Sequence, residues 1–259
     1  MMKNNPFESH GVEHLSPSSI NQFISSPCHW LMKVAGHKTQ SNPAMWRGTA
    51  VDEGVCASIF DDDSLENKQD KARMIARQSF TREEDFAKHE VDRLKADKEY
   101  EKLNDYVDTA VLCYDNIGKK PLETQKKVEV EFEELPIPII GYIDVLYDDH
   151  LRDIKTMGRF TDKVPSNISR QLSVYAYAEK KPAFADFVFT NTKGSHVDSH
   201  EITDVDKHIG VVKKVAYSMM NVLSYSDDIR TVASLMYPDF DHWMWSDHDK
   251  EFATQLWDI

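Results

Sequence analysis

Two aspartates and a lysine stand close together at the ends of two strand-like runs. Asp144 closes a run rich in β-branched residues, and Asp153 and Lys155 follow after a short turn. Because alternate side chains of a strand share a face, Asp153 and Lys155 project together while Ile154 points into a core. If the two runs pair as a hairpin around residues 148–150, Asp144 joins them. Two carboxylates can hold a hard divalent cation, and a lysine can orient or deprotonate a water.

The same residues could also lie on an ordinary solvated hairpin face, since Asp and Lys pair favourably across strands. Their context favours chemistry. The run before Asp144 reads as a buried strand, and Gly141 in it allows close backbone approach. A charge at the edge of such a run costs free energy unless something pairs with it.

The composition is that of a globular protein. The 259 residues are 41% hydrophobic and 29% charged. No apolar run approaches the ~20 residues of a membrane span, and residues 1–8 lack the apolar segment of a signal peptide, so we expect a cytoplasmic protein. Its three cysteines lie far apart, as expected of reduced thiols. The net charge of −13 argues against a nonspecific nucleic-acid coat protein, but not against an enzyme with a local basic groove.

Periodicity and capping residues predict helices in the first part of the chain and strands after Pro121. Ser16 and Pro17 begin a helix that ends near residues 25–27, and a second helix begins near Trp46. Two or three surface helices follow over 65–116. Later helices are predicted over 165–180, 204–224 and 227–236, and strands over 124–132, 137–147, 151–156, 185–192 and 196–203.

These elements predict one domain over 1–259, of the α/β (α+β) class. A central mixed sheet is flanked by helices, and an N-terminal helical portion packs on it. The mainly helical portion covers 15–120, the catalytic sheet core 121–203, and the C-terminal helices with an aromatic tail 204–259.

Gln171 and Tyr175 lie on the helix predicted after the Asp-Ile-Lys strand. A spacing of four residues puts them on one helical face, which can lie across the acidic patch. An aromatic at this spacing is usually a core residue. Gln171 is harder to explain as core, because its amide needs partners.

The motifs form an ordered series. They are Ser16-Pro-Ser-Ser-Ile-Asn-Gln-Phe, Cys28-His-Trp, Arg47-Gly-Thr-Ala-Val-Asp52-Glu53, Gly141-Tyr-Ile-Asp144, Asp153-Ile-Lys155-Thr156 and Gln171-x-x-x-Tyr175. Over about residues 15–190, this series resembles the PD-(D/E)XK nuclease superfamily, specifically its RecB-like, phage-type exonuclease branch. The resemblance implies a restriction-endonuclease-like core. Each motif alone is weak, and their order makes the signal specific.

The resemblance also implies roles for individual residues. The catalytic set would be Asp144, Asp153, Lys155, Gln171 and Tyr175. Asp144, Asp153 and the backbone carbonyl of Ile154 would bind one or two Mg²⁺ or Mn²⁺ ions, and Lys155 would position the attacking water. Gln171 and Tyr175 would support the lysine and contact DNA. DNA contacts are also expected from Ser16, Ser18, Arg47, Arg159 and Arg170.

Asp52 stands where the family usually has histidine. An aspartate can bind Mg²⁺ or Mn²⁺, so the site could be an all-oxygen one. Alternatively the ligand is lost, or Glu53 replaces it. Glu131, on the strand before the hairpin, could approach the metal or lie on an exposed acidic face.

The iron-sulfur members of the family use one early and three late cysteines. Cys28 holds the early position, but no cysteine follows Cys113. We therefore expect no iron-sulfur cluster. The aromatic tail from Tyr237 is expected to replace that staple with apolar packing.

The function implied is a metal-dependent DNA exonuclease of phage or bacterial recombination, repair or degradation. It would act on linear double-stranded ends in a bacterial or phage-infected cell, with 5′ to 3′ polarity. A homo-oligomeric ring and a single-strand annealing protein are expected partners, and a membrane is not. The alternatives are a structure-specific endonuclease and a catalytically silent DNA-binding or scaffold protein.

Overall fold

The computed structural model describes residues 5–86, 93–158, 163–191 and 194–259. The chain divides into two compact units, each assembled from separate stretches of sequence. The first unit comprises Met1–Thr39, Val128–Gly141 and Asp204–Ile259, and the second comprises Gln40–Lys127 and Tyr142–Thr203. The organisation of all 259 residues as a single nuclease domain stays a prediction.

The described strands form a five-stranded mixed sheet in the order β1-β2-β3-β4-β5. β2 and β3 are antiparallel, β3 and β4 are parallel, and β4 and β5 are antiparallel. The strands span Glu123–Val130 (β1), Ile139–Leu146 (β2), Leu151–Met157 (β3), Ala183–Asn191 (β4) and Gly194–Glu201 (β5). The parallel pair requires a crossover, which α8 (Ser166–Glu179) provides while packing on β3 and β4. The predicted mixed sheet flanked by helices is confirmed.

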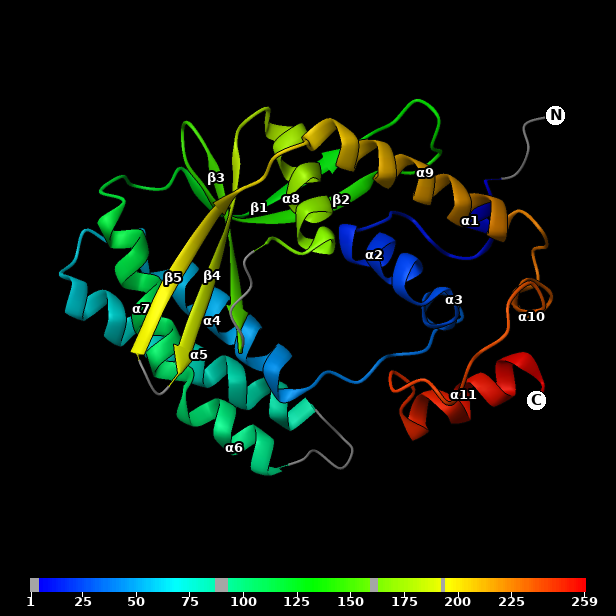
Figure 1. The fold of residues 1–259 in the computed structure, drawn as a ribbon, viewed down its shortest axis with the longest axis horizontal. Coiled ribbons are helices and arrows are strands. Elements are labelled where there is room, and N and C mark those ends of the chain that lie inside the picture. Colours follow the sequence, from blue (N-terminus) through cyan, green and yellow to red (C-terminus); the bar gives the residue numbers. More distant parts are fainter. Residues whose placement is uncertain (1–4, 87–92, 159–162, 192–193) are drawn as a thin grey trace. The chain divides into compact units, whose positions relative to one another are not determined.

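Four helices of the second unit gather beside β4 and β5 in Figure 1, and two of them pack directly on the sheet. They are α4 (Pro43–Ser58), α5 (Leu65–Phe86), α6 (Arg93–Glu101) and α7 (Leu103–Asn116). α4 packs against α5, α7 and β3, and α7 packs against β4 and β5. Their buried apolar residues form one core with Val145, Tyr147, Ile154 and Val188 of the strand region. Ile154 therefore faces the core, as strand alternation predicts.

The N-terminus of α4 follows from local sequence. The Asn42 side chain accepts a hydrogen bond from the backbone N–H of Met45, and Pro43 occupies the first turn, where a missing N–H costs nothing. Trp46, Val51 and Val55 are fully buried in the core. α4 is thus fixed at its start and along one face, which sets the direction of its polar residues.

The first unit contains the remaining helices. They are α1 (Pro6–Ser9), α2 (Pro17–Ser25), α3 (Pro27–Val34), α9 (Val205–Leu223), α10 (Ile229–Ala233) and α11 (Asp247–Trp257). Ser16 caps α2 with a reciprocal capping box, in agreement with the predicted helix start. α2 packs on α3 and α9. Among the described residues, none of the helices combines the length and apolarity needed to cross a bilayer.

The C-terminal tail contains a helix, α11, that the residue pattern does not predict. Ser246 and Asp249 form a capping box that starts α11. The Asp249 carboxylate also accepts a hydrogen bond of 2.6 Å from His37 Nε2. The centroids of the Trp245 and His29 rings are 4.1 Å apart. Polar capping and ring contacts, as well as apolar packing, therefore hold the tail against the start of the chain.

Gly54 marks a close approach of α4 and α5. A Cβ at this position would lie 2.5 Å from the backbone oxygen of Ala72 and 3.1 Å from Ala76 Cβ. By contrast, a Cβ at Gly210 in α9 would meet nothing within 4 Å. The two glycines thus allow the same substitution to be compared in a crowded and in an open helix interior.

We expect Gly54→Ala to lower the free energy of unfolding by about 1–3 kcal/mol, because α5 must shift to accommodate the methyl group. Gly210→Ala should raise it by roughly 0.5–1 kcal/mol through helix propensity alone. Urea denaturation followed by circular dichroism measures both changes. A Gly54→Ala protein as stable as the wild type would contradict the packing described.

Candidate active site

The predicted hairpin between β2 and β3 is present. Val145 pairs with Arg152 and Leu146 with Leu151, and the backbone N–H of Tyr147 donates to the oxygen of His150 at 2.9 Å. Across this hairpin, Asp144 Oδ2 accepts a hydrogen bond of 2.7 Å from the N–H of Ile154. The carboxylate of β2 is therefore fixed to the backbone of β3.

Asp153 and Lys155 lie on the same face of β3 and form an ion pair. Asp153 is 1% exposed and Asp144 is 8% exposed. The structure thus brings together the two carboxylates and the ammonium group that the sequence analysis singles out. Burying two carboxylates with a single ammonium group is unfavourable, so the arrangement carries a cost that a structural role does not require.

Asp52 approaches the same place from α4. Its Oδ2 accepts a hydrogen bond of 2.8 Å from Gln125, and its Oδ1 lies 3.2 Å from the Cys56 thiol. The neighbouring Glu53 instead pairs with Arg82 at 2.6 Å. Successive residues of a helix point about 100° apart, so the two cannot face the same group. Of the two acidic residues considered, the structure directs Asp52 to the acidic cluster.

Gln125, a residue of β1, is not among the residues predicted for the site. Its Nε2 donates to Asp52 Oδ2 at 2.8 Å and lies 3.5 Å from Asp144 Oδ1. It also has a positive φ of 52°. A glutamine in an alternating strand carries no motif, so only the tertiary structure shows its role.

Gln171 and Tyr175 lie together on α8, and Gln171 Nε2 donates to Tyr175 Oη at 3.0 Å. Tyr175 is buried. Gln171 and the acidic residues line the same cavity of about 390 Å³. Its lining includes Asp52, Asp144, Ile154, Lys155 and Gln171. The cavity has room for a substrate group beside the carboxylates, and Gly48 and Thr49 of α4 also line it.

Burial and mutual repulsion dominate the electrostatics of the site. Burial raises the pKa of Asp144 well above its ordinary value, and the charges of Asp153 and Asp52 raise it further. Burial also raises the pKa of Asp52 to about 6. The pKa of Asp153 is raised by burial, which the positive charge of Lys155 opposes. Burial lowers the pKa of Lys155, but Asp153 and Asp144 outweigh it and leave the pKa above the ordinary value. Without a bound cation, the charges of Asp153 and Asp144 therefore favour the ammonium form of Lys155.

The donor set suits a hard divalent cation. Three carboxylates face one ammonium group, and Asp153 Oδ1 has no hydrogen-bond partner among the described residues. In the described part of the chain, no three His, Cys, Asp or Glu side chains already stand closely enough to hold a metal ion. The residues that would hold one are Asp144 and Asp153, with Asp52 and the Ile154 carbonyl beside them. Their oxygens are those that Mg²⁺ and Mn²⁺ prefer.

Of the arginines expected to contact DNA, Arg47 is engaged within the second unit. It is 5% exposed, pairs with Glu99, and stacks 4.6 Å from the centre of the Tyr106 ring. Arg170 is half-buried on α8, and burial lowers its pKa. Arg159 lies outside the described residues. Their contacts with DNA stay predictions.

The other predicted residues belong to the first unit. Ser16 Oγ caps α2 and lies 2.8 Å from the Ser18 hydroxyl. Glu131 is exposed and follows the last residue of β1, which ends at Val130 and not at Phe132 as predicted. Glu131 is therefore not part of an alternating strand face. A DNA contact by the serines and an approach of Glu131 to the metal site stay predictions.

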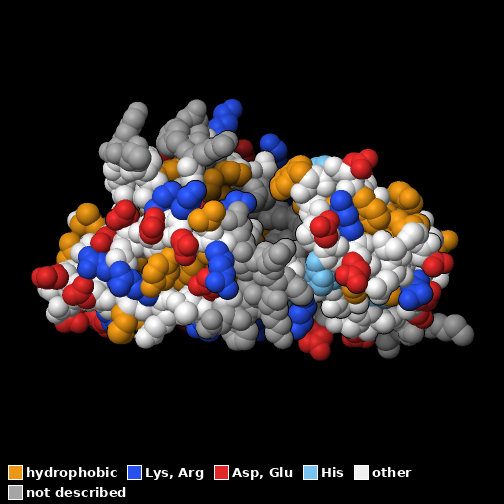
Figure 2. Space-filling model, turned by 90° about the horizontal axis from the view of Figure 1, so that it is seen from below, with side chains coloured by type: hydrophobic (Ala, Val, Ile, Leu, Met, Phe, Trp, Pro, Cys, Tyr) orange, Lys and Arg blue, Asp and Glu red, His pale blue; other side chains and the backbone are white. Residues whose placement is uncertain are grey.

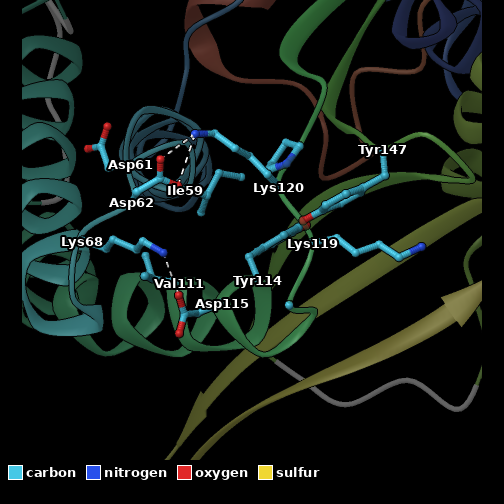
Figure 3. Close-up of a pocket in the computed structure, with 12 residues that line it drawn as sticks. Ile59, Asp61, Asp62, Lys68, Val111, Tyr114, Asp115, Lys119, Lys120 and Tyr147 are labelled. Atoms are coloured by element: carbon cyan, nitrogen blue, oxygen red, sulfur yellow. Dashed lines mark hydrogen bonds and ion pairs between the residues drawn. The ribbon is translucent and has the colours of Figure 1, made fainter.

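A second cavity of about 310 Å³ in the second unit lies between α5, α7 and the segment 118–121 (Figure 3). Tyr114 and Tyr147 line it together with charged residues. Each lysine at its wall is paired with an aspartate: Lys68 with Asp115 at 2.8 Å, Lys120 with Asp62 at 3.1 Å, and Lys119 with Asp149 at 2.5 Å. Its charges thus balance one another, whereas those at the β2–β3 hairpin do not.

Comparisons with known proteins identify a family and a shared fold. A model of the PD-(D/E)XK nuclease superfamily matches residues 14–237. A crystal structure named "Putative exonuclease", from Eubacterium rectale, aligns with a TM-score of 0.57 at 15% identity, covering 97% of this chain and 93% of that one. At this identity it shows a shared fold alone. A structure of SSO0001 aligns with a TM-score of 0.34 at 13% identity over 55% of this chain and 70% of that one, which is too low to support an argument. No curated protein matches.

The raised pKa values predict how a divalent cation affects stability. Between the ordinary aspartate pKa of 3.8 and the raised values, the folded protein binds more protons than the unfolded chain, so stability without the ion falls as pH rises. A cation binds the ionised carboxylates and removes this penalty. We expect Mn²⁺ to raise the melting temperature more at about pH 7.5 than at about pH 5, as measured by calorimetry.

Asp144→Asn provides the control. It replaces a buried carboxyl group by a neutral amide whose oxygen can still accept from the Ile154 N–H, so the ion-free variant should melt no lower than the wild type and should lose the response to Mn²⁺. An equal response of the wild type at both pH values would contradict the electrostatic account.

Proposed function

The chain belongs to the PD-(D/E)XK nuclease superfamily, and we propose that it is a divalent-metal-dependent DNA exonuclease. The observation that carries the proposal is the meeting of Asp144, Asp153 and Lys155 beside a cavity, with Asp52 joining from α4. These groups would bind one or two Mg²⁺ or Mn²⁺ ions and provide a fixed positive charge. Both are required for metal-dependent phosphodiester hydrolysis.

The proposed reaction divides between the bound ion and the side chains. Asp144 and Asp153 would hold the ion, which when bound would supply Lewis-acid chemistry and a bound water of lowered pKa. As an ammonium ion, Lys155 would orient the attacking water and offset negative charge that develops on the phosphate. Asp144 keeps its position through the Ile154 N–H. Cleavage at the 3′-oxygen would leave a 5′-phosphate.

Gln171 and Tyr175 would support substrate positioning. Their hydrogen bond fixes the Gln171 amide on the wall of the cavity that holds Lys155. An amide and a phenol can both contact phosphate oxygens, and such contacts position DNA without reading its sequence. This sequence-independent grip suits an enzyme that acts along a strand.

The charge distribution also bears on how DNA would bind. The net charge is −13, and on the face shown in Figure 2 lysine and arginine side chains are interspersed with aspartate and glutamate. Local contacts near the site, and the metal ions themselves, would then provide the attraction. We propose linear double-stranded ends as the substrate and a role in phage or bacterial DNA processing in the cytoplasm. The 5′ to 3′ polarity, the ring and the annealing partner stay predictions.

A catalytically silent scaffold is the second candidate. It is favoured by one observation: Asp52, which replaces the usual histidine, is engaged by Gln125 and Cys56. Such a protein would bind DNA without cutting it. A structure-specific endonuclease would also retain the catalytic set but would cut away from ends.

We expect the wild type to degrade linear duplex DNA with Mg²⁺ or Mn²⁺, to leave circular DNA intact, and to be inactive with EDTA. Lys155→Ala and Asp153→Asn should each slow cleavage by about 10³-fold or more, because they remove charge stabilisation or a metal ligand. End-labelled substrates analysed on denaturing gels measure this. Lys71→Ala, which removes an ion pair with Asp61, serves as the control and should keep full activity.

The other outcomes discriminate clearly. Cutting of circles would indicate the endonuclease, and binding without cutting in any metal would indicate the scaffold. Wild-type rates in folded Lys155→Ala protein would refute the assignment of the site.

A further inference from the structure

Gln125 has a backbone conformation that its side chain does not favour. It lies within β1, yet its φ is 52°, in the left-handed region that L-residues other than glycine, asparagine and aspartate rarely adopt. Glycine would be tolerated there without strain. A strained glutamine persists only where the surrounding structure holds it, and such residues concentrate at functional sites.

The side chain of Gln125 reaches the acidic cluster. Its Nε2 lies 2.8 Å from Asp52 Oδ2, 3.5 Å from Asp144 Oδ1 and 3.7 Å from Cys56 Sγ. The amide N–H groups thus approach the carboxylates of two different elements, α4 and β2. Since Asp52 Oδ1 faces Cys56, both oxygens of Asp52 have a neighbour that restricts their position.

Another residue would be expected if the role were only structural. The Gln125 side chain is exposed, so it fills no core space. A glycine would relieve the backbone at φ 52°. What a glycine could not supply is a donor between Asp52 and Asp144.

We propose that Gln125 is a positioning residue for the metal site. Its amide bridges Asp52 and Asp144 and holds the Asp52 carboxylate on the side of Asp144. In this orientation Asp52 can serve as a metal ligand. This inference rests on the proposed metal-dependent function. Outer groups that orient ligands typically change metal affinity 10- to 100-fold when they are removed.

The test compares two substitutions at Gln125 with one at a neighbouring position. Gln125→Gly removes the amide and relieves the backbone. Gln125→Asn tolerates the left-handed conformation but is one methylene shorter. Glu123→Ala changes an exposed residue of the same strand and controls for general charge. Mn²⁺ binding to the DNA-free protein is measured by calorimetry and by the electron paramagnetic resonance signal of free Mn²⁺, and the melting temperature is measured without metal.

We expect Gln125→Gly to melt at or above the wild-type temperature and to bind Mn²⁺ about tenfold or more weakly. Gln125→Asn should also bind more weakly, and Glu123→Ala should bind as the wild type does. In nuclease assays, Gln125→Gly should need more Mn²⁺ for half-maximal rate while its rate at saturating Mn²⁺ stays within about threefold.

Two results would overturn the proposal in distinguishable ways. If Asp153→Asn abolishes Mn²⁺ binding but Gln125→Gly binds as tightly as the wild type, the positioning role is wrong and the proposed function stands. If the wild type itself binds no Mn²⁺, both fail. A large fall in melting temperature of Gln125→Gly would show that the residue is structural, and would likewise overturn the proposal.

Discussion

The site depends on the electrostatic repulsion between buried carboxylates that lie close together. Asp144 and Asp153 are almost completely buried within reach of each other and of Asp52, and Lys155 is the ammonium group paired with them. Without further compensation, burial and repulsion drive the carboxylates toward protonation. A hydrophobic or neutral set would make a more stable fold. The cost is understandable if a cation neutralises the cluster when the protein works.

Each surrounding element restricts the position of one or more side chains of this cluster. The hairpin ties Asp144 to the N–H of Ile154, and the pleat of β3 puts Asp153 and Lys155 on one face while Ile154 enters the core. α4 is held by its Asn42 cap and its close contact with α5 at Gly54, and it delivers Asp52. β1 delivers Gln125 through a conformation that ordinary strand residues avoid. Rigid elements thus supply all the charged groups, as a preorganised site requires.

How far the sequence predicts this arrangement depends on whether local rules are enough. Strand alternation predicts the shared face of Asp153 and Lys155, and the short turn after Tyr147 predicts that Asp144 joins them. Helical spacing predicts the contact between Gln171 and Tyr175. The mixed sheet also follows from the order of strands and helices. These features arise from periodicity within one or two elements, which the sequence carries directly.

Features that tertiary contacts determine cannot be predicted from local periodicity. The choice between Asp52 and Glu53 depends on how α4 is rotated about its axis, which packing against α5 and α7 decides. Arg47 is a plausible DNA contact by type, yet it is buried against Glu99 and Tyr106. α11 is not predicted because the aromatic residues of the tail lack a clear helical period, although Ser246 and Asp249 form a helix cap. Gln125 depends on a backbone angle that no residue pattern encodes.

The central claim is that Asp144 and Asp153 share a cation next to Lys155. The most direct measurement is anomalous diffraction from a crystal of the protein soaked in Mn²⁺. We expect an anomalous peak about 2.0–2.4 Å from oxygens of both aspartates, with the Asp52 carboxylate turned toward it. A fully soaked crystal in which manganese binds elsewhere, or in which these carboxylates bind none, would contradict it.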